Sequence, residues 1–498
     1  MIINEELALL IQSRYPIVYF ESIDEEYSIK QLQQIAVRFG LAFFQWTVTE
    51  GLRKGDRENC YYQTKQPIAV LTMIAALTKP DYIESAIFVL KDFDKYIDDA
   101  VVLRHFKDIV NKIKKVHACI NLVILSPNYK LPIDLEPDTV HFVGGYPNEE
   151  EIEQIIQQAT NELRKKDRIF QLTLTDQDMR LIVKTLRGLT GQQIKNIINQ
   201  CMLEDYTLNI HDLQRIESCK KEIFDQEGIL EFCIPDHKHN IANLDNLKRW
   251  LTERKESFLQ SEPSSKLPTP KGVLLMGVQG CGKSLAIKVI ANELRLALYR
   301  LDLSKLYSKY IGETEQNLRK TLKIIEQLAP LCLWIDEIEK VFAASGGDID
   351  GGVSQRILGT FLTWMQERKT PCFIAATANN IYQLPPEFLR KGRFDEIFFV
   401  DLPDIATREH IFRIHLFKRN LDVQEFDCKL LAQTSVDFNG AEIEQVIIAA
   451  LYSATHKQET VTTQHIIEQL RSTKPLSVIK REEIIALRAW AKERTIPA

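Results

Sequence analysis

Several patterns that would assign a protein to a class at once are missing from this sequence. Its nine cysteines are scattered and none forms C-x-x-C, which fits free thiols in a reducing compartment and gives no support to a zinc site. No H-E-x-x-H motif occurs, so a zinc protease of that type is excluded. No apolar run is long enough to cross a bilayer, and the N-terminus carries no basic segment. We therefore expect a soluble chain with neither a membrane span nor a secretory signal.

An excess of basic residues is also missing. The chain has 63 lysines and arginines against 68 aspartates and glutamates, a net charge of −5 and a pI of about 6.1. This balance argues against a broad basic surface for nucleic acid, which makes nucleic acid an unexpected partner, but it leaves a local basic patch open. With 498 residues, of which 45% are hydrophobic and 26% charged, the chain has the composition of a globular protein of about three domains.

One glycine-rich stretch, residues 277–284, organises the rest of the chain. It reads G-V-Q-G-C-G-K-S, follows the apolar run 272–276 and leads into a helical pattern, so it matches G-x-x-x-x-G-K-[ST] in the required strand–loop–helix context. Glycines let backbone N–H groups approach phosphate oxygens, and the helix N-terminus adds partial positive charge. The sequence therefore predicts an ATP site (Walker A) built from Gly277, Val278, Gln279, Gly280, Cys281, Gly282, Lys283, Ser284 and Leu285.

Within this loop, Lys283 is expected to reach the β- and γ-phosphates, and the Ser284 hydroxyl to ligate Mg²⁺. Cys281 has two interpretations. A helix N-terminus can lower a thiol pKa and make the cysteine redox-sensitive, or the residue can be a small filler.

A second nucleotide signature is the run L-C-L-W-I-D-E at 331–337. A strand buried on both faces ends there in two acids. Asp336 is placed to bind the Mg²⁺ shell, and Glu337 to accept a proton from the attacking water (Walker B).

Together with A-T-A-N at 376–379 and L-R-K-G-R-F-D at 389–395, these motifs resemble those of AAA-family ATPases over about residues 240–460. The resemblance implies an α/β fold: a three-layer P-loop NTPase with a parallel sheet and a C-terminal helical lid. It also implies Mg²⁺-dependent ATP hydrolysis at the subunit interfaces of a homo-oligomeric ring, usually a hexamer.

The same resemblance assigns roles to further residues. Asn379 matches the sensor that orients the lytic water, and Arg390 and Arg393 match arginine fingers that reach a neighbour's γ-phosphate. The backbone of Gly440 and Ala441 is expected to approach the nucleotide.

Two segments match the loops that face the axis of an AAA ring. Tyr310, Ile311 and Gly312 match the tip of the first pore loop, although Tyr310 could instead be a core aromatic before a turn. The glycine-rich segment 346–352 would be the second pore loop.

The first half of the chain repeats the order of elements in the second. Three segments of the first half align in sequence with three of the second at offsets near 250: 89–95 with 334–340, 125–132 with 378–385, and 189–194 with 438–443. Fixed-period similarity predicts an internal duplication, so we expect a degenerate AAA-like α/β module at 1–225. Four acids at 21–26 and Lys91, in the place of Asp336, predict that this module binds no nucleotide.

The expected domains are 1–225, a linker with one helix at 226–270, the large AAA subdomain at 271–403, the lid at 404–475 and a last helix at 476–498. This arrangement and its C-terminal tail resemble a narrower group, the uncharacterised AAA proteins encoded as hypothetical reading frames in red-algal chloroplast genomes and in cyanobacteria. That resemblance implies chloroplast stroma or cyanobacterial cytoplasm. Two functions remain open: a remodeller that pulls a protein client past Tyr310, or a nucleotide-switched binding platform with slow hydrolysis. A third, DNA handling, is weakened by the acidic pI.

Overall fold

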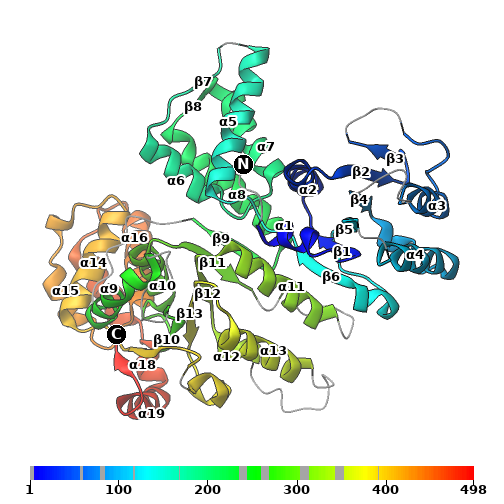
Figure 1. Ribbon diagram of the computed structural model, residues 1–498. Coiled ribbons are helices and arrows are strands. Elements are labelled where there is room, and N and C mark those ends of the chain that lie inside the picture. Colours follow the sequence, from blue (N-terminus) through cyan, green and yellow to red (C-terminus); the bar gives the residue numbers. More distant parts are fainter. Residues whose placement is uncertain are drawn as a thin grey trace. The chain divides into compact units, whose positions relative to one another are not determined.

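The computed structural model in Figure 1 describes residues 5–55, 60–78, 85–115, 118–167, 169–234, 244–259, 269–302, 305, 313–342, 353–390 and 392–498. The chain divides into two compact units, Met1–Ile216 and Glu217–Ala498, and the boundary falls inside helix α8 (Leu213–Glu227). Among the described helices, none combines the length and apolarity that a bilayer crossing requires.

The first unit contains a six-stranded sheet in the order β3-β2-β4-β5-β1-β6. Its parallel strands are β1 (Ile17–Glu21), β2 (Ala42–Thr47), β4 (Ala86–Lys91), β5 (Ile120–Ser126) and β6 (Thr139–Val143), with β3 (Gly51–Lys54) antiparallel at one edge. Helices α1 (Glu5–Gln12) and α2 (Glu25–Phe39) bury apolar side chains against one face, and α3 (Pro67–Leu77) and α4 (Ala100–Ile113) against the other. The sheet is thus the middle of three layers.

The second unit contains a seven-stranded sheet in the order β15-β14-β10-β13-β12-β11-β9. Its strands are β9 (Leu230–Cys233), β10 (Gly272–Gly277), β11 (Ala297–Leu301), β12 (Leu331–Ile335), β13 (Cys372–Ala378), β14 (Glu396–Val400) and β15 (Ile496–Pro497). All pair in parallel except β9, which is antiparallel to β11. Helices α9 (Asp245–Leu259) and α10 (Lys283–Leu294) cover one face, while α11 (Glu313–Leu328) packs on α13 (Val353–Glu367) and α12 (Ile338–Phe342) contacts β13.

A helical subdomain follows each sheet. In the first unit it consists of α5 (Glu149–Lys166), α6 (Asp176–Leu186), α7 (Gly191–Asp205) and the start of α8, with the short pair β7 (Gln171–Leu172) and β8 (Thr207–Leu208). In the second unit it consists of α14 (Ile405–Lys418), α15 (Cys428–Thr434), α16 (Gly440–His456) and α17 (Thr463–Ser472), followed by α18 (Leu476–Ile479) and α19 (Arg481–Lys492). Thr190 and Asn439 are the N-caps of α7 and α16, and each forms a capping box. Both helices therefore begin at the next residue, Gly191 or Gly440, for the same local reason.

The two sheets share one strand order, as expected for an AAA-like α/β module in the first half. Reading from one edge, β2-β4-β5-β1-β6 corresponds to β11-β12-β13-β10-β14. The segment expected to be only a linker with a helix does more than connect the units. Its residues 230–233 form the antiparallel edge strand β9 of the second sheet, and its helix α9 packs on that sheet.

Candidate functional site

The glycine-rich loop joins β10 to α10 and holds the Lys283 side chain inside its own curve. Lys283 is the first residue of α10, is buried, and donates hydrogen bonds to the carbonyl oxygens of Gly277 (2.9 Å) and Val278 (2.8 Å). Burial lowers the pKa of this ammonium to about 8 by desolvation, although the charges of Glu339, Asp336 and Glu337 act in the opposite direction. Gly280 has φ +79° and a Cβ there would lie 2.8 Å from the Asn439 side chain, so the loop requires glycine. A phosphate would supply the anion that this ammonium needs.

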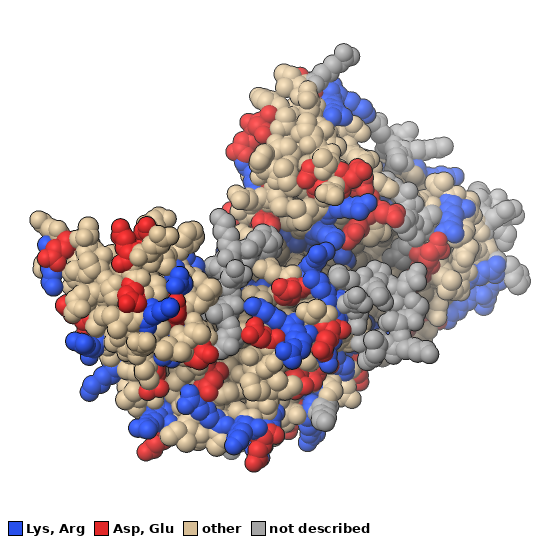
Figure 2. Space-filling view, turned by 90° about the vertical axis from the view of Figure 1, so that its left-hand side faces the viewer, with Lys and Arg blue, Asp and Glu red and all other residues tan. Residues whose placement is uncertain are grey.

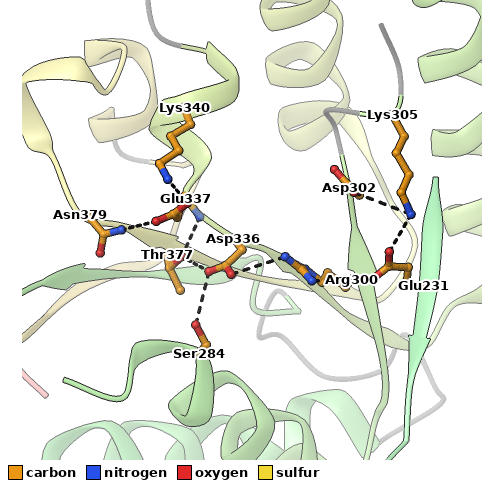
Figure 3. Close-up of polar contacts among 10 residues, drawn as sticks. All are labelled: Glu231, Ser284, Arg300, Asp302, Lys305, Asp336, Glu337, Lys340, Thr377 and Asn379. Carbon is orange, nitrogen blue, oxygen red and sulfur yellow. Dashed lines mark hydrogen bonds and ion pairs between the residues drawn. The ribbon is translucent and has the colours of Figure 1, made fainter. Parts of the chain in front are cut away.

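Asp336 follows β12 and gathers hydroxyl groups from two neighbouring elements (Figure 3). Its Oδ1 accepts a hydrogen bond from the Thr377 hydroxyl at 2.7 Å and lies 3.4 Å from the Ser284 hydroxyl. A carboxylate beside a hydroxyl at the start of α10 provides the oxygen ligands that Mg²⁺ prefers. The residue types and spacing therefore fit a magnesium nucleotide.

Glu337 points toward Asn379 at the same edge of the sheet. The Asn379 Nδ2 donates to Glu337 Oε1 at 2.8 Å, and Lys340 forms an ion pair with the other carboxylate oxygen. The Glu337 backbone has φ +48° and donates its N–H to the Thr377 hydroxyl, at 2.8 Å. A non-glycine residue in this region costs roughly 1–3 kcal/mol and is typical of functional sites. The turn thus brings the Glu337 carboxylate and the Asn379 amide together at this edge of the sheet.

Glu339 holds the backbone at Asn379 through hydrogen bonds. It is 1% exposed, and its Oε1 accepts the backbone N–H groups of Asn379 (2.8 Å) and Asn380 (3.4 Å). Burial raises the pKa of the Glu339 carboxyl, and the backbone donors oppose this shift. The sequence analysis missed both Glu339 and Thr377. The spacing of Glu339 two residues after Glu337 was visible, but its partners lie about 40 residues away.

A cavity of about 480 Å³ connects these groups with the lid. It is lined by the glycine-rich loop, Asp336, Glu337 and Asn379 together with apolar residues such as Val400, Ile411 and Ile414. Ala441 donates its backbone N–H to Gly280 O at 3.2 Å, and Asn439 Nδ2 donates to Gln279 O at 3.2 Å. The size suits a small-molecule site. Gly440 and Ala441, whose backbone was expected to approach the nucleotide, therefore lie beside the glycine-rich loop.

The other predicted residues are Cys281, the two candidate arginine fingers and the two pore-loop segments. Burial raises the pKa of the Cys281 thiol to about 12, which is opposite to the lowering that redox sensitivity requires. Arg390 is exposed and Arg393 half-buried, and neither lines the cavity. The two pore-loop segments, which include Tyr310, Ile311 and Gly312, lie outside the described residues.

The surface carries charges of both signs. On the face drawn in Figure 2, lysine and arginine side chains are interspersed with aspartate and glutamate. The described residues on this face therefore form no broad basic surface for a nucleic-acid backbone.

Comparison with known proteins places this site in a family. Residues 273–402 match the model described as "ATPase family associated with various cellular activities (AAA)", and residues 3–143 and 150–227 match the N-terminal and second domains of SpoVK-like AAA ATPases. An "Uncharacterized AAA domain-containing protein ycf46" from Trieres chinensis is 36% identical over 99% of this chain and 97% of its own length. The chain belongs to the AAA ATPase family.

Further AAA relatives carry the same description. The proteins from Guillardia theta and Pyropia yezoensis are each 35% identical over 98% of this chain, covering 94% and 97% of their own lengths. The narrower resemblance to these uncharacterised AAA proteins is thereby confirmed. Membership of the AAA family implies nucleotide binding and ATP hydrolysis in general.

At the corresponding place in the first unit, the charges are exchanged. Glu25 is the first residue of α2, as Lys283 is of α10, and it forms an ion pair of 2.9 Å with Lys91, which ends β4 where Asp336 follows β12. Only residues 22–24 separate β1 from α2, whereas residues 278–282 separate β10 from α10. A shorter loop with inverted charges cannot surround a phosphate in the same way.

A carboxylate of the chain bridges the two helix N-termini of this first site. Asp24 accepts the backbone N–H of Tyr27 at 3.1 Å, as the cap of α2, and that of Gly191 at 2.7 Å, at the start of α7. Gly191 has the position in α7 that Gly440 has in α16. The Asp24 carboxylate therefore occupies donors of the kind that a bound phosphate would otherwise use.

We expect the full chain to hold one nucleotide and the variant Lys283→Ala to hold none. Lys283 is expected to provide the charge contact of the second unit, and Asp24 and the Glu25–Lys91 pair are expected to exclude phosphate from the first. Calorimetric titration with MgATP measures the stoichiometry of both proteins, and a thermal melt controls for folding. Saturable binding that survives in Lys283→Ala would contradict the degenerate assignment of residues 1–225.

Proposed function

We propose that the chain is an ATP-driven remodeller of protein clients that works as a ring, with ATP and Mg²⁺ bound between subunits. The observation that carries this proposal is the convergence of Ser284, Asp336, Glu337 and Asn379 on one cavity beside the glycine-rich loop. Two further observations support it: the near balance of acidic and basic residues, which favours a protein client over nucleic acid, and the similarity to AAA proteins over 99% of the chain.

Each residue of the site has a task that its contacts support. Magnesium, when bound, would neutralise phosphate charge and polarise the transferred phosphoryl group. Ser284 and Asp336 would hold this ion, and Thr377 fixes the Asp336 carboxylate through a hydrogen bond of 2.7 Å. Lys283 would bind the β- and γ-phosphates.

Glu337 and Asn379 would act on the attacking water. The amide of Asn379, held by Glu339 beneath its backbone, positions the Glu337 carboxylate through a 2.8 Å hydrogen bond. From this place Glu337 can accept the proton of a water directed at the γ-phosphate. Arg390 and Arg393 would contact the γ-phosphate of the adjacent subunit, which fits their absence from the cavity of their own chain.

The platform alternative is favoured by one specific observation, the charge-inverted first unit. A module of more than 200 residues that has lost its own phosphate site is suited to recognise a partner, whether the partner is threaded or only held. In either case we place the protein in the chloroplast stroma or the cyanobacterial cytoplasm, following the group of proteins that it resembles.

We expect client protein to stimulate ATP hydrolysis, and Tyr310→Ala to remove this stimulation while leaving basal turnover within about two-fold. An aromatic side chain that grips a client contributes to translocation and not to phosphate chemistry. Steady-state ATPase assays with and without an unfolded client measure both rates, and Tyr310→Phe is the matched control. Stimulation that persists in Tyr310→Ala would reject threading and favour the platform.

A further inference from the structure

Arg300 lies between two carboxylates from the strands on either side of its own. Its Nη2 is 3.7 Å from Oδ2 of Asp336, which follows β12, and its Nη1 is 3.8 Å from Oε2 of Glu231 on β9. Arg300 and Glu231 are directly opposite each other in the antiparallel register of β11 and β9. Because the two distances are nearly equal, neither carboxylate holds the guanidinium alone (Figure 3).

Trp334 provides a flat support beneath this guanidinium. The Arg300 Cζ lies 5.2 Å from the centroid of the Trp334 ring. A planar guanidinium stacked on an indole keeps its height above the ring but can shift within its plane between hydrogen-bond acceptors. The Arg300 side chain is 41% exposed, so water screens both ion pairs and neither is strong. A small change in nearby charge is enough to alter the balance between them.

Glu231 has a second cationic partner. The Lys305 ammonium is 2.8 Å from Glu231 Oε1 and 3.8 Å from Asp302. The charges therefore form a series, Asp336–Arg300–Glu231–Lys305, that starts at the nucleotide site and ends on β9 and at Lys305 (Figure 3). In the sequence, β9 directly follows α8, and Lys305 precedes Tyr310 by five residues.

We propose that Arg300 is a charge relay that reports a bound magnesium nucleotide to β9 and Lys305. The proposal rests on the function proposed above and assigns a regulatory partner set to the same site. Asp336 presents its Oδ1 to Ser284 and Thr377 and its Oδ2 to Arg300. With a divalent cation held by Ser284 and Asp336, the guanidinium of Arg300 would shift along Trp334 toward Glu231, because like charges repel. Glu231 in turn loosens its contact with Lys305.

This relay predicts opposite effects for two neutral substitutions. In Arg300→Met, the cation that opposes magnesium at Asp336 is gone, so half-saturation should need about three- to ten-fold less Mg²⁺. In Glu231→Gln, Arg300 has only Asp336 as an anionic partner, so half-saturation should need more Mg²⁺ than in the wild type. Loss of fold cannot produce shifts of opposite sign. The measurement is a Mg²⁺ titration of the full chain with a fluorescent ADP analogue at fixed concentration.

Hydrogen exchange tests whether the signal arrives. In the wild-type chain, Mg²⁺ with ADP should change the exchange of amides at residues 230–233, and this change should disappear in Arg300→Met although nucleotide is bound. Arg319→Gln is the matched control, because Arg319 is exposed and pairs only locally with Glu315 on α11 among the contacts described. It should behave as the wild type in both experiments.

The outcomes separate the two proposals. A wild-type chain that binds no magnesium nucleotide overturns the proposed function and the relay together. Normal binding with an unchanged Mg²⁺ requirement in Arg300→Met, or with the β9 response intact in that variant, overturns the relay alone.

Discussion

Arg393→Ala is expected to lower ATP turnover by roughly 10³-fold or more while leaving nucleotide affinity within a few-fold of the wild type, as for an arginine finger supplied in trans. Arg393 does not line the cavity of its own chain, and its side chain forms no ion pair with a described residue. Its removal should therefore cost catalysis and not folding. Steady-state turnover and calorimetric affinity, measured on the same preparation, separate the two effects.

Subunit mixing tests whether the arginine acts on a neighbour. Arg393→Ala chains retain an intact nucleotide site, and Lys283→Ala chains retain an intact Arg393. A mixed ring contains interfaces that combine the intact halves, so the mixture should be more active than either component. A mixture with no gain over its components would argue against action in trans. Arg413→Ala, which removes an exposed lid arginine paired with Glu409, is the control and should keep wild-type turnover.

The sequence predicted the parts of the fold that follow from local patterns. The apolar runs at 17–20, 86–90 and 121–125 correspond to β1, β4 and β5, because strands buried on both faces are continuously apolar. The shared strand order of the two sheets agrees with the duplication inferred from three short matches. The short edge strands β3, β9 and β15 were not predicted, since their pairing depends on partners far away in the chain.

The candidate site shows the same division. Motif spacing was sufficient to expect Lys283, Ser284 and Asp336 together, and the structure brings them to one cavity. Thr377 was not expected as the residue that fixes Asp336, because their hydrogen bond joins neighbouring strands 41 positions apart. In the first unit, Lys91 was recognised in the place of an aspartate, but its pairing with Glu25 could only come from the fold.

Glu337→Gln is expected to bind MgATP with wild-type affinity and to hydrolyse it about 10²- to 10⁴-fold more slowly, because a general base is lost. The contacts proposed to hold nucleotide come from Lys283, Ser284 and Asp336, none of which the substitution changes. A glutamine oxygen can still accept from Asn379 Nδ2, so the turn at φ +48° should persist. Single-turnover hydrolysis and equilibrium binding on the full chain give the two quantities.

The matched control is Lys340→Met. It removes the ion pair with Glu337 but keeps the carboxylate, and Lys340 is 64% exposed, so little stability should be lost. If Glu337 is the base, this variant should turn over at least as fast as the wild type, because the carboxylate no longer shares its charge with an ammonium. Turnover in Glu337→Gln within three-fold of the wild type would reject the assignment. A simultaneous loss of ATP binding would instead make Glu337 a residue that shapes the site, since a base acts on the water and not on the affinity for nucleotide.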